Sequence, residues 1–302
     1  MSTRMVLRRF LSPELMDWME SSMEKLQMLL LTVDALYGCA IGLMCYFAPQ
    51  FIGDYVFQRK SDGVHWHLLR CFGAQILSQA FMNYRLRDST ESSKTASYFI
   101  RITSSVVSMM LIVRCITETP SLIADWKLAL AFLFFAFLLG IYGILLIWTG
   151  WPVGSKAVVA DESIEGGVSR VLFQLDSITH ICIGLTWITF PTWLLQGQVA
   201  GILDESHELV GRMMGTFFIA TFANGLHAVH WSSVRDQRAV VMSRAICDFG
   251  ILCAQVWSQV AYEEAWSDFH WVGIGLFTIW TVLALLHLFI HPSEEKKQQK
   301  QD

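Results

Sequence analysis

Residues 126–149 read WKLALAFLFFAFLLGIYGILLIWT, an apolar run whose only charge is Lys127 near its start. A helix rises about 1.5 Å per residue, so about 20 apolar residues cross a hydrocarbon layer of roughly 30 Å. A run of this length with a single charge predicts a transmembrane helix. How often such runs recur on either side of it decides the fold of the whole chain.

Seven further apolar stretches of similar length flank this one. They cover 26–48, 64–85, 96–117, 170–190, 207–230, 238–260 and 270–291. Over all 302 residues, 54% are apolar and 16% are charged, whereas soluble domains carry charge on roughly 25% of their residues. The chain therefore has too little charge to cover a water-facing surface. We predict an all-α integral membrane protein with eight transmembrane helices.

An amphipathic segment precedes the first stretch, and residues 1–25 are expected to contain an N-terminal amphipathic helix. Ser12, Pro13 and Glu14 favour a helix start, because Ser caps the N-terminus, Pro fits its first position and an acid complements the helix dipole. The turns that follow place an apolar stripe along one face. The stripe consists of Leu15, Trp18, Met19, Met23 and Leu26. Three placements stay open: on the membrane surface, leading into the first span, or packed on a partner protein.

Positive charge gathers in alternate loops. The N-terminus, the 150–169 linker and the 292–302 tail carry Lys and Arg, as do the second and sixth loops. The opposite set of loops has only Arg59 and Lys60, with Lys127 at a helix start. Because Lys and Arg favour the cytosolic side, we predict that both termini are cytosolic.

The chain repeats a pattern of its own. Asp34-x6-Ile41-Gly42-Leu43-x5-Pro49 returns as Asp176-x6-Ile183-Gly184-Leu185-x5-Pro191, 142 residues later. The same offset relates Arg70 to Arg212. An even number of helices in each unit gives parallel halves related by an axis along the membrane normal. We therefore predict two tandem four-helix repeats, 26–149 and 170–291.

The first half resembles a known family. The residues that carry the resemblance are IGLMCYFAPQFIGDYVF at 41–57 and HLLRCFGAQILSQAFMNYRL at 67–86. They resemble the small four-helix membrane proteins called tumour-suppressor-inducible protein eleven and, more loosely, the DoxX-like superfamily of four-helix units. The second half repeats their Phe, Pro, Arg, Gly and Asn positions. The resemblance implies a multi-pass membrane protein of the endoplasmic reticulum, and it carries over no catalytic residue.

Charged residues inside the predicted spans need partners, because each costs at least about 2.5–3.5 kcal/mol at the centre of a membrane helix. Counted at 1.5 Å per residue, Asp34 and Arg101 lie roughly 12 and 8 Å from the same membrane face. We predict that they pair. The remaining expected pairs are Asp176 with Arg244, Arg70 with Glu118, and Arg212 with Glu263 or Glu264. These pairs would hold helices in register, line an ion or proton path, or bind lipid phosphate.

Two residues mark a secondary site. Asp248 lies one turn beyond Arg244, whereas the first half has Ser105 at that place, and His180 is the only histidine inside the 170–190 span. His227 and His230 have no accompanying acid or cysteine in the sequence, so no metal site is predicted. No catalytic motif and no cofactor motif is found either. The net charge of −4 provides no basic stripe for nucleic acid.

These features favour a non-enzymatic accessory or scaffold subunit of a larger membrane complex, one that handles or transfers lipid. Its expected partners are membrane lipids and a larger membrane protein. The intramembrane Asp and Arg residues leave a small-solute or ion transporter or channel as the alternative. An intramembrane enzyme would have to rely on His180 and Asp176, which lie one helical turn apart.

Overall fold

The computed structural model describes residues 10–152 and 164–290, with the side chains of 164–166 left out of the description. This part of the chain is mostly helical, with two isolated bridges and no β-strand. The helices are α2 (Pro13–Phe47), α3 (Pro49–Val56), α4 (Gly63–Leu86), α5 (Glu91–Glu118), α6 (Asp125–Thr149), α7 (Ile164–Thr189), α8 (Pro191–Gln196), α9 (Glu205–Ala228), α10 (Val234–Ala261) and α11 (His270–Ile290), with a short 3-10 turn, η1 (Glu263–Ala265). The all-α prediction is confirmed.

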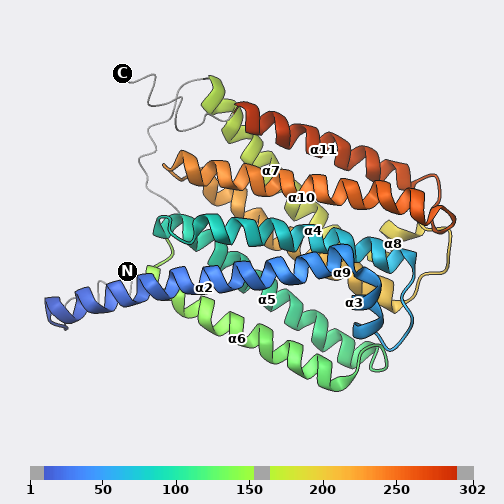
Figure 1. The fold of residues 1–302 in the computed structure, drawn as a ribbon, viewed down its shortest axis with the longest axis horizontal. Helices are drawn as coiled ribbons and strands as arrows, with labels where there is room; N and C mark the ends of the chain where they lie inside the picture. Colours follow the sequence, from blue (N-terminus) through green and yellow to red (C-terminus); the bar gives the residue numbers. More distant parts are fainter. Residues whose placement is uncertain (1–9, 153–163, 291–302) are drawn as a thin grey trace.

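The first helix, α2, runs without a break for 35 residues. It starts as predicted, since the Ser12 side chain accepts a hydrogen bond from the backbone N–H of Leu15 and Pro13 occupies the first turn. The amphipathic segment is therefore not separate from the helix that follows, because no Pro interrupts the chain before Pro49. Its N-terminal turns extend past the other helices (Figure 1).

Six of the described helices are long and apolar enough to cross a membrane: α2, α5, α6, α7, α10 and α11. The other two long helices, α4 and α9, are more polar. Gln75, Gln79 and Asn83 on α4 and Asn224 on α9 are all buried within the protein. These side chains lower the apolar content of the helices without facing the surroundings.

The two polar helices lie at the centre of the bundle (Figure 1). Helix α4 packs against α2, α9 and α10, and α9 packs against α5 and α7. Helices α6 and α11 lie at the two flanks, against α5 and α10 respectively. Both flank helices present large apolar side chains outward, such as Leu133 and Phe137 on α6 and Val272 on α11. The predicted halves therefore share one core, because α10 packs on α4 and α5 packs on α9.

Glycines allow the closest helix contacts. A Cβ on Gly73 of α4 would lie 2.8 Å from the carbonyl oxygen of Gly42 on α2, closer than real Cβ contacts come. A Cβ on Gly215 of α9 would likewise lie 2.9 Å from the carbonyl oxygen of Gly184 on α7. Backbone-to-backbone packing at both places requires glycine.

The starts of α4 and α9 also match. Asp62 and Asp204 are the N-caps, and each carboxylate accepts two backbone N–H bonds from the first turn. Partial burial alone would raise the pKa of Asp62, but hydrogen bonds from His207 and His65 outweigh it and hold that pKa well below its ordinary value. An ionised cap also complements the positive end of the helix dipole.

Candidate functional site

The buried acid of α2 lies in a complete hydrogen-bond network. Oδ2 of Asp34 accepts hydrogen bonds from Nε of Arg101 at 2.6 Å, from Nδ2 of Asn83 at 2.8 Å and from the Tyr142 hydroxyl at 3.0 Å. Asp34 and Arg101 are each only 8% exposed. The structure thus brings the expected pair together, and three other helices contribute a donor to the acid of α2.

The cluster around Asp176 contains more charged residues than the one around Asp34. Asp176 contacts the Arg244 guanidinium, and Nε of Arg244 also donates to Oδ2 of Asp248 at 3.1 Å. His180 lies against Asp176, with Nδ1 3.0 Å from its Oδ1 and 2.9 Å from its backbone oxygen. One arginine is therefore shared by two buried carboxylates, and the two residues of the predicted secondary site both belong to this cluster.

The expected pairs of Arg70 and Arg212 are wrong. Glu118 pairs instead with Arg114, one turn earlier on the same helix, at 2.6 Å. Arg70 lies over the Tyr262 ring, with its guanidinium carbon 5.8 Å from the ring centre. Glu118 thus has a cation one turn away on its own helix, and Arg70 lies against the ring that follows the end of α10.

Arg212 likewise has an oppositely charged residue one turn away on its own helix. It contacts the backbone oxygen of Ile188 and lies 3.5 Å from Glu208, one turn before it. Glu263 and Glu264, its expected partners, belong to η1 and make no ion pair with it among the described residues. The spacing of Glu208 and Arg212, and of Arg114 and Glu118, was the signal that could have given these pairs from the sequence.

Buried amides connect the two charge clusters. Gln79 donates to Asn83 at 2.8 Å, and Asn83 in turn bonds Asp34. Asn224 reaches Oε1 of Gln79 at 3.4 Å. Asn224 also lines a small cavity of about 20 Å³ together with Asp176, His180 and Arg244. A cavity of that size holds about one water molecule, so polar groups continue from α2 to α7 through the centre of the protein.

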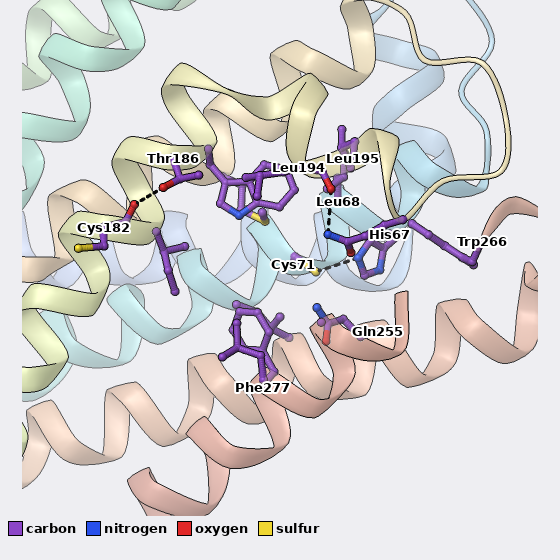
Figure 2. A pocket seen from close by; sticks show the side chains of 17 residues that line it. His67, Leu68, Cys71, Cys182, Thr186, Leu194, Leu195, Gln255, Trp266 and Phe277 are labelled. Carbon is purple, nitrogen blue, oxygen red and sulfur yellow. Dashed lines mark hydrogen bonds between the residues drawn. The ribbon is translucent and has the colours of Figure 1, made fainter. Parts of the chain in front are cut away.

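A larger cavity of about 240 Å³ lies between α4, α7, α9, α10 and α11 (Figure 2). Most of its wall is apolar, and no charged side chain of the described residues lines it. The apolar side chains are Leu68, Ile183, Trp187, Leu194, Leu195, Met214, Ile251, Leu276 and Phe277. The polar side chains His67, Gln198, Gln255 and Trp266 lie toward one end. Figure 2 shows His67 and Trp266 at that end and Cys182 and Thr186 at the other.

The polar end of this cavity contains groups without a partner. Oε1 of Gln255 and Nε1 of Trp266 are buried and have no hydrogen-bond partner among the residues that the structure describes. The Trp266 ring is fixed by stacking on His270, with ring centres 4.0 Å apart. His67 meets Trp266 edge-on at 4.9 Å, and its Nε2 lies 3.7 Å from Sγ of Cys71. Buried polar atoms nearly always have partners, so an unpaired acceptor and an unpaired donor at one cavity end indicate a place for a ligand.

These residues have no polar equivalents in the other half. The residues 143 positions before Gln255 and Trp266 are Ile112 and Ile123, and the residue 142 positions after His67 is Leu209. Ile112 and Ile123 belong to the main hydrophobic core. No sequence pattern considered above predicts this cavity. A glutamine inside the 238–260 stretch, opposite an isoleucine in the repeat, was the signal available.

An all-helical bundle in which six helices are long and apolar enough to cross a membrane is consistent with a multi-pass membrane protein. The chain belongs to the family described as "Domain of unknown function (DUF8292)", whose family model matches residues 32–289. No curated protein and no solved structure matches the chain.

Proposed function

We propose that this chain is a non-enzymatic membrane protein that binds a neutral, hydroxyl-bearing lipid in the cavity between α7 and α11. The observation that carries this proposal is that Oε1 of Gln255 and Nε1–H of Trp266, on two residues that line the cavity, have no hydrogen-bond partner among the described residues. A hydroxyl group both donates and accepts hydrogen bonds, so a hydroxyl-bearing ligand can supply the donor that Gln255 needs and the acceptor that Trp266 needs. An anionic head group would find no cation among the residues that line the cavity.

The lipid enters from the side. Cys182 of α7 and Leu276 of α11 line the cavity and are also exposed on the outer surface. About 240 Å³ is less than the 300–1,000 Å³ of common ligand pockets. The cavity therefore takes the hydroxyl end of the molecule and the first part of its chain, and the remainder lies along α7 and α11 in the bilayer.

The same proposal includes eight membrane crossings in two parallel four-helix units. Helices α4 and α9 each have 24 residues, about 36 Å, which is enough to cross a bilayer. Their polar side chains face other helices and not lipid. Matching caps, matching glycine contacts and the 142-residue offset support two copies of one unit, as does the resemblance to the four-helix tumour-suppressor-inducible and DoxX-like proteins.

We propose that both termini are cytosolic, which the distribution of Lys and Arg among the loops supports. We also propose that the protein lies in the endoplasmic reticulum, which the resemblance supports. Trp266 comes just after the C-terminal end of α10. In this orientation that end lies on the luminal side, opposite to the start of α2, so the polar end of the cavity faces the luminal leaflet. Protease protection of a tag at each terminus tests this orientation. A protected tag at either terminus overturns it.

The setting that we propose is an accessory or scaffold subunit of a larger membrane complex. The exposed N-terminal turns of α2, which include Trp18, support a docking role for that helix. Native purification followed by mass spectrometry tests this. A stable monomer that co-purifies with no other membrane protein contradicts it.

Photo-crosslinking tests the lipid proposal. The protein in nanodiscs is exposed to a photoactivatable diacylglycerol or to a phosphatidylserine probe of equal chain length. We expect the neutral probe to label peptides of α7 and α11. Gln255→Leu and Trp266→Phe should each weaken its binding about three- to tenfold, because a neutral hydrogen bond contributes about 0.5–1.5 kcal/mol.

Gln75→Leu is the matched control for Gln255→Leu. Gln75 is also buried, and its side-chain nitrogen and oxygen also lack partners within the described part of the chain, but it lies outside this cavity. The control should label as the wild type does. Equal labelling by the anionic probe, or unchanged labelling of both cavity variants, contradicts the proposal.

A second candidate, ion or proton transport, is favoured by one observation: the polar chain that joins Asp34 to Asp176 through Asn83, Gln79 and Asn224. Proton flux in liposomes measures it. Flux that Asp34→Asn and Asp176→Asn both abolish would favour transport over lipid binding. A wild type without flux would remove transport from consideration.

A further inference from the structure

The starts of α4 and α9 bring two histidines together. His65 and His207 are both buried, and their rings lie with centres 3.8 Å apart. Each follows its own N-cap aspartate by three residues, so both imidazoles face the same point between the helices. The Asp62 side chain lies beside them and is 56% exposed, which gives this point a route to water.

The distances among these groups suit a metal ion. Oδ1 of Asp62 lies 2.9 Å from Nδ1 of His65, and Oδ2 lies 3.1 Å from Nε2 of His207. One ligand atom from each of the three residues can be chosen so that all lie within 4.8 Å of one another. Ligands held about 2.0–2.1 Å from a tetrahedral zinc ion are roughly 3.3 Å apart, so small movements of the side chains would produce that geometry.

The remaining ring nitrogens already have partners of the type that metal-bound histidines use. Nε2 of His65 lies 2.7 Å from the Ser206 hydroxyl, and Nδ1 of His207 lies 2.9 Å from Oδ1 of Asp204. Arg59 holds Asp204 from the other side at 3.0 Å. A carboxylate or hydroxyl on the outer nitrogen fixes the ring orientation and raises the basicity of the nitrogen that binds the metal.

We propose that Asp62, His65 and His207 bind one Zn²⁺ ion, with a water molecule in the fourth position. Two imidazoles and a carboxylate are common zinc ligands, and the fourth position faces the exposed side of Asp62. Together Asp62 and Asp204 balance the charge of the ion. Because His207 belongs to α9 and the other two ligands to the start of α4, the ion joins the two halves of the chain.

This site was not predicted from the sequence because its ligands form no compact motif. Asp62 and His65 supply an Asp-x2-His pair, and the third ligand comes 142 residues after His65. The competing account is a metal-free network, in which Nδ1 of His65 accepts a hydrogen bond from the Asp62 backbone N–H at 3.3 Å. The experiment below separates the two.

Zinc binding is measured on the full chain, purified in detergent without a polyhistidine tag and stripped with EDTA. After incubation with Zn²⁺ and gel filtration, we expect one zinc per chain by elemental mass spectrometry. His65→Ala, His207→Ala and Asp62→Ala should each weaken binding at least tenfold. His230→Ala removes an exposed histidine beyond the opposite end of α9 and should leave zinc binding unchanged.

A second measurement on the wild-type chain tests the site even if the variants fail to fold. Co²⁺ in place of Zn²⁺ should give the strong visible absorption of a four-coordinate complex, and Zn²⁺ should displace it. Wild-type protein that retains no zinc and gives no such absorption overturns the proposal in favour of the hydrogen-bonded network. Zinc binding that persists unchanged in a folded His65→Ala/His207→Ala variant overturns it as well.

Discussion

Removing the charge of Asp34 should destabilise the protein more than removing the charge of Asp176. Asp34→Asn keeps the shape of the side chain but leaves the buried Arg101 without a carboxylate among the described ion pairs. Breaking a buried ion pair from one side costs about 3–5 kcal/mol. Asp176→Asn leaves Arg244 with Asp248 at 3.1 Å, so only about 1.5–3 kcal/mol of charged hydrogen bonding is lost.

Thermal unfolding in detergent measures the difference. At about 2 °C per kcal/mol, the lower end of the range for larger domains, Asp34→Asn should lower Tm by about 6–10 °C and Asp176→Asn by about 3–6 °C. The combined Asp176→Asn/Asp248→Asn variant removes both partners of Arg244. The Tm of this variant should be at least as low as that of Asp34→Asn.

A double-mutant cycle provides the control. Arg101→Met removes the other charge, so Asp34→Asn/Arg101→Met should recover part of the loss that each single variant causes. Strictly additive losses in the double variant would show that the two residues do not stabilise each other. Equal losses for Asp34→Asn and Asp176→Asn would refute the role given to Asp248.

Three further predictions concern local contacts. Tyr142→Phe removes one donor to Asp34 while Arg101 and Asn83 remain, so it should cost about 1–2 kcal/mol in the free energy of unfolding, measured by chemical denaturation. Gly73→Ala would press a methyl group on the backbone of α2 and should cost about 1–3 kcal/mol, whereas Gly140→Ala, which has open space around it, should not lower Tm. Arg59→Ala breaks only exposed ion pairs with Asp204 and Glu205, and its Tm in the absence of zinc should match that of the wild type.

The sequence predicted the features that depend on nearby residues, such as helix starts, and on how deep a charged residue lies in its predicted span. Ser12 and Pro13 start a helix wherever they stand before an apolar run, and α2 begins there. The contacts of Asp34 with Arg101 and of Asp176 with Arg244 followed from counting 1.5 Å per residue from one membrane face, because buried charges at equal depth need each other. The same counting gave the wrong partners for Arg70 and Arg212. Depth alone does not show that Glu118 and Arg212 each have a partner of opposite charge one turn away on the same helix.

The cavity and the histidine cluster could not be predicted from local sequence patterns, because such patterns do not show which helices are neighbours. His67 meets Trp266, and His65 meets His207, only because helices of different halves are neighbours in the bundle. Sequence periodicity indicates which face of a helix is apolar, but it does not indicate which other helix covers that face. The amphipathic segment before residue 26 shows a smaller form of the same limit. Its pattern was clear, but its continuity with the rest of α2 depended on the absence of a breaking residue.

Positions that agree between the halves and positions that differ have separate physical roles. Where they agree, as at Gly42 and Gly184 or at Asp34 and Asp176, both residues satisfy the same requirement of helix packing or of a buried ion pair. Gln255 and Trp266 meet no such requirement, since Ile112 and Ile123 fill the matching places as ordinary core residues. A buried amide and an indole N–H without partners destabilise the protein relative to those isoleucines. Gln255 and Trp266 therefore carry a cost that Ile112 and Ile123 avoid, and a ligand whose hydroxyl groups satisfy both atoms would offset it.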